Sequence, residues 1–260
     1  MPSPAETAPN APAPRKSARL YRMVMDKHVC PYGLKAKYLL EREGYDVDDH
    51  WLTTRAETDA FQAQHHVDTT PQTFIDGKRI GGYDDTRRFL GKAVKDPDAV
   101  TYVPVIAIFS VAALMALASH WALSGHALTL RSLEWFVAFS MCLLALQKLR
   151  DVDGFATMFL GYDLLARRWV PYAYLYPFGE LLAGVLMIAH GLPWIAAPVA
   201  LWLGSVGAVS VVYAVYVQKR ELKCACVGGG SNVPLGFVSL TENVMMVVMG
   251  LWTLARSFVG

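Results

Sequence analysis

The chain of 260 residues is poor in cysteine and in charge. Its four cysteines are too few and too irregularly spaced for the disulfide framework of a small secreted protein. Only 18% of its residues are charged, against 54% hydrophobic residues. The net charge is +2, and no basic stripe with interleaved aromatic residues is present. We therefore expect no nucleic-acid partner.

The N-terminus lacks the apolar run of a secretory signal. Residues 1–18 are rich in Pro and Ala, and we expect them to form a disordered tail. The first membrane-inserting segment is then internal, so we expect the soluble part before it to stay in the cytoplasm.

Long apolar runs begin only near residue 102. We predict a soluble domain at 19–94, a linker at 95–101 and a membrane domain at 102–260, placed in the bacterial inner (cell) membrane as a multi-pass, lipid-embedded protein. About five transmembrane helices are expected, at 102–123, 132–149, 171–190, 193–217 and 235–256. The segment 155–169 contains Asp163, Arg167 and Arg168, which favours an interfacial helix over a sixth span.

The soluble domain alternates short strands with helices. Strands are expected at 20–25, 47–51, 72–75 and 78–80, the last two joined by the turn Asp76-Gly77. Helices are expected from Pro31 to near Gly44, at 57–66 and at 84–92. The order β-α-β-α-β-β-α predicts an α/β fold with a small mixed sheet, followed by an all-α membrane helix bundle.

A cysteine motif lacks its usual second half. Cys30-Pro31-Tyr32-Gly33 follows the first strand and opens a helix, and Gly33 stands where a second cysteine is usual. The unpaired N–H groups and positive dipole end of a helix favour the thiolate of Cys30, and Lys27 adds positive charge. Thiolate is the attacking species in disulfide exchange.

This motif, together with the segment from Thr69 to Asp85, resembles the glutaredoxins over nearly the whole soluble domain. The resemblance implies a thioredoxin-like fold, a cis peptide bond before Pro71 and glutathione as co-substrate. It places glutathione against six residues: Lys27, Tyr32, Thr70, Pro71, Gly82 and Asp85.

Two departures narrow the expected chemistry. Gly33 prevents the usual intramolecular disulfide, so a monothiol route through Cys30 and glutathione remains. The Cys-Gly-Phe-Ser pattern of iron–sulfur-carrying relatives is absent, and we assign no metal site.

A second cysteine motif precedes the last expected span. Cys224-Ala225-Cys226, followed by a glycine run, resembles the signature loop of the MauE branch of the DoxX-like membrane proteins, with the match best from about residue 132. The resemblance implies a role in disulfide or redox maturation. Such a pair can form a strained, easily reduced disulfide or bind Cu(I).

Charge predicts the orientation of the expected spans. With the N-terminus inside, the two cytoplasmic loops hold seven basic residues: Lys148, Arg150, Arg167, Arg168, Lys219, Arg220 and Lys223. The other side holds Arg131 and Arg256. This topology puts the Cys224/Cys226 loop in the cytoplasm with Cys30, whereas a sixth span at 155–169 would reverse it.

The sequence thus favours a membrane-embedded, glutathione-linked thiol-disulfide oxidoreductase. Cys30, Cys224 and Cys226 would be its reacting thiols, and its partners would be glutathione and a glutathionylated or disulfide-bearing protein or small thiol. Two alternatives stay open: a transporter or copper- or thiol-handling protein with a tethered loading domain, and an enzyme that the spans merely anchor. Cys142, inside a span, is expected to be packing, and Glu180 is either a functional intramembrane carboxylate or an interfacial one.

Overall fold

The chain divides into two compact units. A computed structural model describes residues 16–96, 99–225 and 232–259. The units meet between Pro97 and Asp98, inside the expected linker. Each unit is described by itself below.

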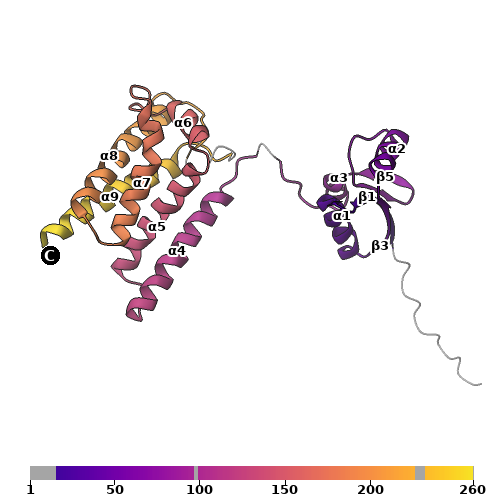
Figure 1. The fold of residues 1–260 in the computed structure, drawn as a ribbon, viewed down its shortest axis with the longest axis horizontal. Coiled ribbons are helices and arrows are strands. Elements are labelled where there is room, and N and C mark those ends of the chain that lie inside the picture. Colours follow the sequence, from indigo (N-terminus) through magenta and orange to yellow (C-terminus); the bar gives the residue numbers. More distant parts are fainter. Residues whose placement is uncertain (1–15, 97–98, 226–231, 260) are drawn as a thin grey trace, which may run out of the picture. The chain divides into compact units, whose positions relative to one another are not determined.

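The N-terminal unit has a thioredoxin-like fold, as the element order predicted. Its central strand β1 (Lys16–Met25) pairs in parallel with β3 (Tyr45–Leu52) and antiparallel with β4 (Gln72–Ile75). Strand β4 pairs antiparallel with β5 (Lys78–Gly81), and the two-residue β2 (His28–Val29) folds back on the end of β1. The helices are α1 (Pro31–Arg42), α2 (Arg55–His65) and α3 (Tyr83–Phe89) (Figure 1).

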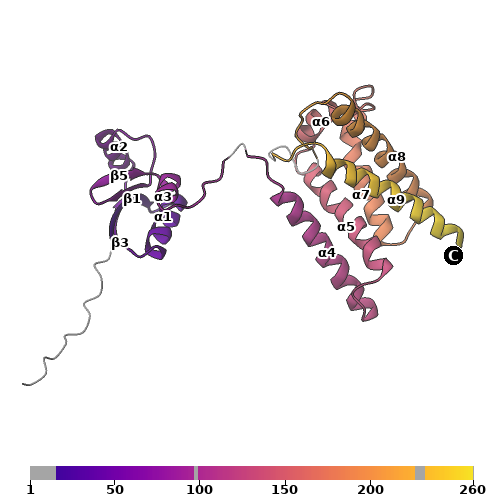
Figure 2. The ribbon, with the colours of Figure 1, turned by 180° about the vertical axis from the view of Figure 1, so that it is seen from behind.

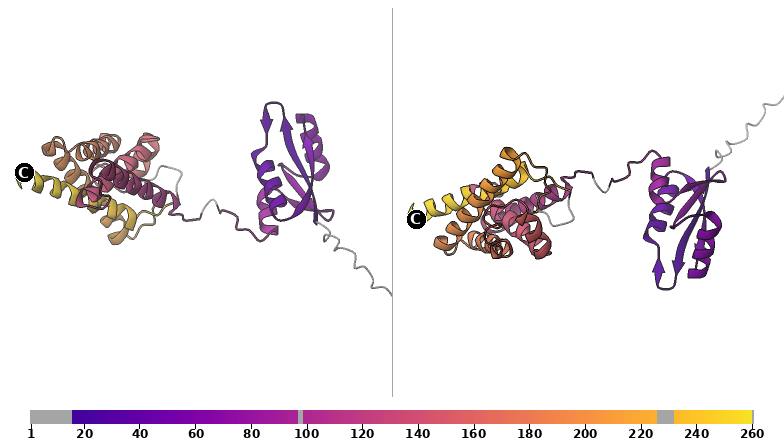
Figure 3. Two further views of the ribbon diagram at one scale, coloured as in Figure 1. Left: turned by 90° about the horizontal axis from the view of Figure 1, so that it is seen from below. Right: turned by 90° about the horizontal axis from the view of Figure 1, so that it is seen from above.

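The helices cover both faces of this sheet (Figure 3). Successive side chains of a strand point to opposite faces. Tyr21 of β1 therefore stacks on Phe61 of α2, with ring centroids 4.6 Å apart, while its neighbour Arg22 faces Gly33 of α1. Helix α1 thus packs on the face that Arg22 occupies.

Strand β1 begins earlier than the sequence suggested. Lys16 and Ser17, which we assigned to the tail, pair with Tyr45 and Asp46 of β3. Ala18 is buried in the core with Leu40 and Tyr45. Lys16 and Ser17 are polar and exposed, so no apolar pattern marked them as strand, and only pairing with β3 orders them.

The C-terminal unit is a bundle of long helices (Figure 2). Within its described residues, four helices are long and apolar enough to cross a membrane. They are α4 (Val103–Ser124), α5 (Leu130–Leu149), α8 (Pro193–Val211) with its π-helical extension η1 (Val212–Val217), and α9 (Phe237–Val259). Many large apolar side chains of these helices face outward, among them Ile106, Leu114 and Trp202. The chain is a multi-pass membrane protein.

The described part of the bundle contains two further helices. Helix α7 (Pro171–Ile188) coincides with the third expected span and packs between α5 and α8. Its 18 residues include three tyrosines, an internal Pro177 and Glu180, which lower its hydropathy, and a five-span count remains a prediction. Helix α6 (Val152–Leu160) has nine residues, about 14 Å of rise, and is too short to cross a bilayer.

One end of the bundle is marked by the start of α4, where the linker enters, and we call it the linker end. Val105 and Ile108 of α4 pack there with Leu144 near the end of α5, and with Cys224 and Val233. Arg220, just beyond η1, donates a hydrogen bond at 3.0 Å to the carbonyl of Gly161, which follows α6. The residues that flank α6 and the residues that flank the Cys224 loop therefore lie at the linker end.

Candidate thiol-redox sites

Cys30 is the N-cap residue of α1. Its backbone is extended, Pro31 occupies the first helical turn, and its N–H donates to the carbonyl of Met23 at 3.1 Å. The Cys30 side chain is buried. Its Sγ lies 3.9 Å from the carbonyl oxygen of Thr70. The motif thus places the thiol at the dipole-positive end of a helix, as predicted.

The segment before β4 forms the other wall of this site. The peptide bond between Thr70 and Pro71 is cis, as the glutaredoxin resemblance implied. The position of a Cβ on Gly82 lies 3.7 Å from the carbonyl oxygen of Pro71, so the start of α3 closely approaches this wall. Cys30, Thr70, Pro71 and Gly82 are therefore brought together from three separate segments.

The remaining expected glutathione residues differ in placement. Tyr32 is exposed beside the site, with its ring 6.1 Å from that of Tyr83. The carboxylate of Asp85 bonds to groups of its own helix: Oδ2 accepts a hydrogen bond from the N–H of Gly82 at 3.0 Å, and Oδ1 pairs with Arg88 at 2.6 Å. Lys27 is exposed three residues before Cys30, and within the described part of the chain it makes no hydrogen bond or ion pair with the other site residues.

Packing explains why position 33 is occupied by glycine, in addition to the chemical effect of the missing cysteine. A Cβ at this position would lie 2.7 Å from Cβ of Arg22 and 2.9 Å from its Cδ. Arg22 is itself fixed, because its guanidinium makes two hydrogen bonds of 2.8 Å to the carboxylate of Asp49. Burial raises the pKa of Asp49, but hydrogen bonds from Arg22, Trp51 and Lys37 outweigh it and hold the pKa at about 2. The space that a second cysteine would need is thus filled by Arg22.

Replacing Gly33 by Cys is therefore expected to destabilise the N-terminal unit by about 1–3 kcal/mol, the usual cost of overpacking. Chemical denaturation of residues 1–97, followed by circular dichroism, measures this loss. In a chain that already carries Arg22→Ala, adding Gly33→Cys should cost less stability than it does in the parent, because the clashing Arg22 side chain is gone. Equal stability of Gly33→Cys and the parent would contradict the packing account.

Cys224 is buried at the linker end of the bundle. Residues 222–224 pair antiparallel with residues 233–235: the N–H of Cys224 donates to Val233 at 2.7 Å, and the N–H of Leu235 donates to Leu222 at 2.7 Å. The Sγ of Cys224 lies 3.1 Å from Oγ of Ser239 in the first turn of α9. Cys226, its expected partner, and the glycines that follow lie outside the described residues. These two backbone hydrogen bonds thus hold the ends of the loop together beside the buried thiol of Cys224.

A buried charged cluster lies in the same bundle. Nζ of Lys148, from the last turn of α5, is 2.6 Å from Oε2 of Glu180 in α7 and 2.7 Å from Oε1 of Glu242 in α9. All three side chains are buried. Glu180 therefore lies in the interior of the helix bundle. Lys148 is not a loop charge, which reduces the basic residues of the linker end from seven to six and leaves the predicted orientation unchanged.

Polar side chains continue from this cluster toward Cys224. Nζ of Lys148 lies 5.4 Å from the ring centroid of Tyr176, whose hydroxyl donates to Oδ1 of Asn243 at 3.4 Å. Nδ2 of Asn243 donates to the carbonyl of Ser239 at 2.7 Å. Ser239, Glu242 and Asn243 are three and four residues apart on α9 and share its inward face. Sequence reasoning missed Lys148 and Glu242, although charges within apolar helices are a signal of function.

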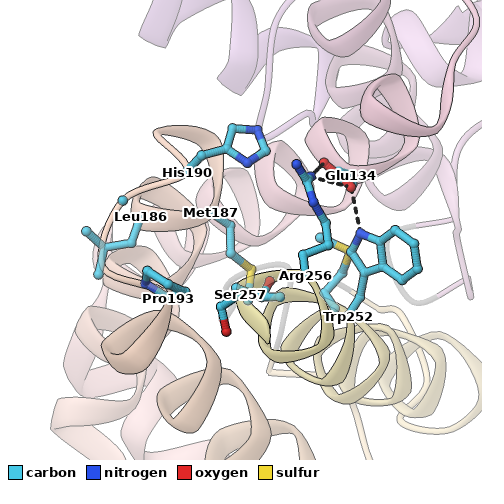
Figure 4. A pocket seen from close by; sticks show the side chains of 11 residues that line it. Glu134, Leu186, Met187, His190, Pro193, Trp252, Arg256 and Ser257 are labelled. Carbon is cyan, nitrogen blue, oxygen red and sulfur yellow. Dashed lines mark hydrogen bonds and ion pairs between the residues drawn. The ribbon is translucent and has the colours of Figure 1, made fainter. Parts of the chain in front are cut away.

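A separate cavity of about 180 Å³ lies near the opposite end of the bundle. Figure 4 shows Arg256 and Trp252 of α9 directed at Glu134 of α5. The carboxylate of Glu134 accepts from Arg256 at 2.8 Å and from Trp252 at 2.6 Å. His190 lines the same cavity. Since Glu134 and Lys148 are about 21 Å apart along α5, this cavity is distinct from the Lys148 cluster.

Each of the two units is similar to known proteins. The N-terminal part is similar to the hybrid peroxiredoxin hyPrx5 of Haemophilus influenzae, with 34% identity over 77 residues. The match covers 30% of this chain and 32% of that protein, so the chain spans about a third of the length of this relative. The similarity accords with a thioredoxin-fold redox domain.

The helical unit matches a family over most of its length. Residues 126–256 match the family described as methylamine utilisation protein MauE, and the matched segment includes α5 to α9 up to Arg256, the Cys224 loop and all three members of the charged cluster. The match begins after α4, which joins it to the thioredoxin-like unit. Since it spans half of the sequence, the chain belongs to the MauE family.

Proposed function

We propose that this protein is a membrane-embedded, glutathione-linked thiol-disulfide oxidoreductase. Cys30 exchanges disulfides with glutathione by a monothiol route and then with the Cys224/Cys226 pair of the membrane unit. That pair passes reducing equivalents to or from a disulfide-bearing protein or small thiol. Both thiol sites face the cytoplasm in this proposal.

The N-terminal site supports the glutathione step. Cys30 has no resolving cysteine, and Arg22 fills the space beneath Gly33, so its disulfide partner comes from another molecule or another part of the chain. Oγ1 of Thr70 is buried and has no hydrogen-bond partner among the described residues, and the carbonyl of the same residue contacts the Cys30 thiol. A polar ligand such as the glutathione backbone would satisfy this hydroxyl.

The position of Cys224 carries the exchange between the two units. Cys224 lies at the linker end, the end at which α4 receives the chain from the thioredoxin-like unit. Residues 90–102 separate α3 from α4 and span up to about 45 Å when fully extended. A tether of that length gives two thiol sites on one membrane face a high effective concentration for each other.

A trapping experiment tests this exchange in the full chain. Variants that retain only Cys30 and Cys226, or only Cys30 and Cys224, are treated in membranes with a mild oxidant, and disulfides are identified by mass spectrometry of peptides. The proposal predicts a Cys30–Cys226 or Cys30–Cys224 disulfide. A variant that retains only Cys30 and Cys142 is the matched control and should form none. Absence of any crosslink to the loop, with Cys30 still reactive toward glutathione disulfide, would exclude the exchange.

A further inference from the structure

A groove on the surface of the N-terminal unit gathers basic and aromatic side chains. It lies between α1 and α3 and has a volume of about 280 Å³. Six of its lining side chains are basic or aromatic: Lys35, Tyr38, Arg42, Tyr83, Arg87 and Lys92. Glu43 also lines the groove, and it pairs with Lys92 at 2.8 Å. Among the described lining residues, four cations thus face a single carboxylate, and we call this site the basic groove.

Helix α1 presents a stripe of exposed side chains at this groove. Lys35, Tyr38 and Arg42 are three and four residues apart, so they lie in line along the helix. Tyr38 is 65% exposed. A tyrosine ring suits the layer of lipid headgroups because its body is apolar and its tip is polar, and long basic side chains can reach the phosphates around it. The stripe therefore has the chemistry of a surface that contacts a bilayer.

The connection to the membrane unit begins at the basic groove. The N–H of Lys92 donates to the carbonyl of Arg87 at 2.8 Å, and the guanidinium of Arg87 donates to the carbonyl of Ala93. The first residues after α3 are therefore folded back onto this helix. Residues 94–102 lead from there to α4, and they span up to about 30 Å when fully extended. The basic groove is thus tethered close to the start of a membrane helix.

The opposite face of the sheet has a different charge pattern. There Arg55 of α2 pairs with Asp59 at 2.9 Å, and Arg19 of β1 pairs with Asp48 at 3.1 Å. Neighbouring acids neutralise these cations, whereas the basic groove has an excess of positive charge. An anionic surface is therefore expected to attract the unit by its α1–α3 side.

We propose that the basic groove docks the N-terminal unit on the anionic lipid headgroups of the bilayer. Lys35, Arg42 and Lys92 face lipid phosphates, and the ring of Tyr38 enters the headgroup layer. The tether favours lipid over a soluble acidic protein, because it keeps the groove at a high effective concentration near the bilayer. The docking needs no thiol chemistry, so it is independent of the proposed function.

Fluorescence quenching by labelled lipid tests this docking in the full chain. A bimane fluorophore is attached to a single cysteine in an otherwise cysteine-free chain, either at Glu41→Cys on α1 or at Ala63→Cys on α2; both positions are exposed. The protein is placed in nanodiscs of phosphatidylcholine, with or without phosphatidylglycerol, that contain a lipid with a nitroxide on its headgroup. We expect strong quenching at Glu41→Cys in the anionic discs, lost at high salt, and little quenching at Ala63→Cys.

Neutralising two cations of the groove isolates their contribution. Each basic residue near an anionic surface strengthens binding about 5-fold, so Lys35→Gln with Arg42→Gln should lower the ratio of docked to free unit about 25-fold. Lys78→Gln with Arg79→Gln, on β5, is the matched control, because it removes the same charge outside the groove and should leave the quenching unchanged. All four side chains are exposed, so both variants should fold.

Two results would overturn the inference. One is equal quenching at Glu41→Cys in neutral and anionic discs, which would show that anionic lipid is not recognised and that the excess charge of the groove serves an acidic protein partner. The other is an equal loss of quenching in the groove variant and in the β5 variant, which would show that net charge acts without a specific surface.

Discussion

Replacing Lys148 with Met is expected to destabilise the helical unit by about 3–5 kcal/mol, the typical cost of removing one partner from a buried ion pair. The substitution leaves Glu180 and Glu242 facing each other in the interior without their shared ammonium. Because these residues come from α5, α7 and α9, the loss should loosen the packing of all three helices. Unfolding of the purified protein in mixed micelles with increasing dodecyl sulfate measures the change.

The triple substitution Lys148→Met, Glu180→Gln and Glu242→Gln provides the control for this prediction. It removes the charges together, and replacing a whole buried ionic cluster is often close to neutral for stability. We therefore expect the triple variant to be more stable than Lys148→Met alone. If Lys148→Met unfolds at the same detergent fraction as the parent, the buried cluster is not a stabilising element.

Replacing Cys30 with Ser is expected to reduce glutathione-dependent reduction of a glutathionylated peptide to the level of buffer. Cys30 is the only cysteine in the sequence of the N-terminal unit, residues 1–97, so no other thiol of that unit can take its place. A hydroxyl at the same helix N-terminus is a far weaker nucleophile than a thiolate. The assay couples release of glutathione disulfide to a reductase and follows the consumption of its cofactor.

The Cys142→Ser variant is the matched control for this loss. Cys142 lies inside α5 and is not placed in either thiol site, so its removal should leave the rate unchanged. Retention of most of the activity by Cys30→Ser, or an equal loss in Cys142→Ser, would show that Cys30 is not the reacting thiol.

The features that the sequence predicted well are those encoded locally. A cysteine followed by proline at a helix start, and a turn such as Asp76-Gly77 between two short strands, each depend on a few neighbouring residues. The position of Cys30 opposite Pro71 followed from the resemblance of two such motifs. The long apolar helices were likewise read from composition, because about 20 apolar residues in a row have few alternatives to a membrane span.

The features that the sequence did not reveal depend on contacts across the fold. Lys148 lies 32 residues from Glu180 and 94 from Glu242, and its place at the end of an apolar run gave it the pattern of a loop cation. Gly33 was read only as the loss of a thiol, since nothing local shows that Arg22 fills the space beneath it. Both cases involve buried polar side chains whose partners come from other elements.

Exchange between Cys30 and the Cys224 loop requires both to face the same compartment. Single reporter cysteines in an otherwise cysteine-free chain test this, with a membrane-impermeant maleimide applied to intact cells and to inverted vesicles. Asp84→Cys reports on the N-terminal unit, Glu221→Cys on the Cys224 loop, and His126→Cys on the turn between α4 and α5; all three positions are exposed. We predict labelling of Asp84→Cys and Glu221→Cys only in inverted vesicles, and of His126→Cys only in intact cells. Labelling of Asp84→Cys and Glu221→Cys from opposite sides would contradict the exchange.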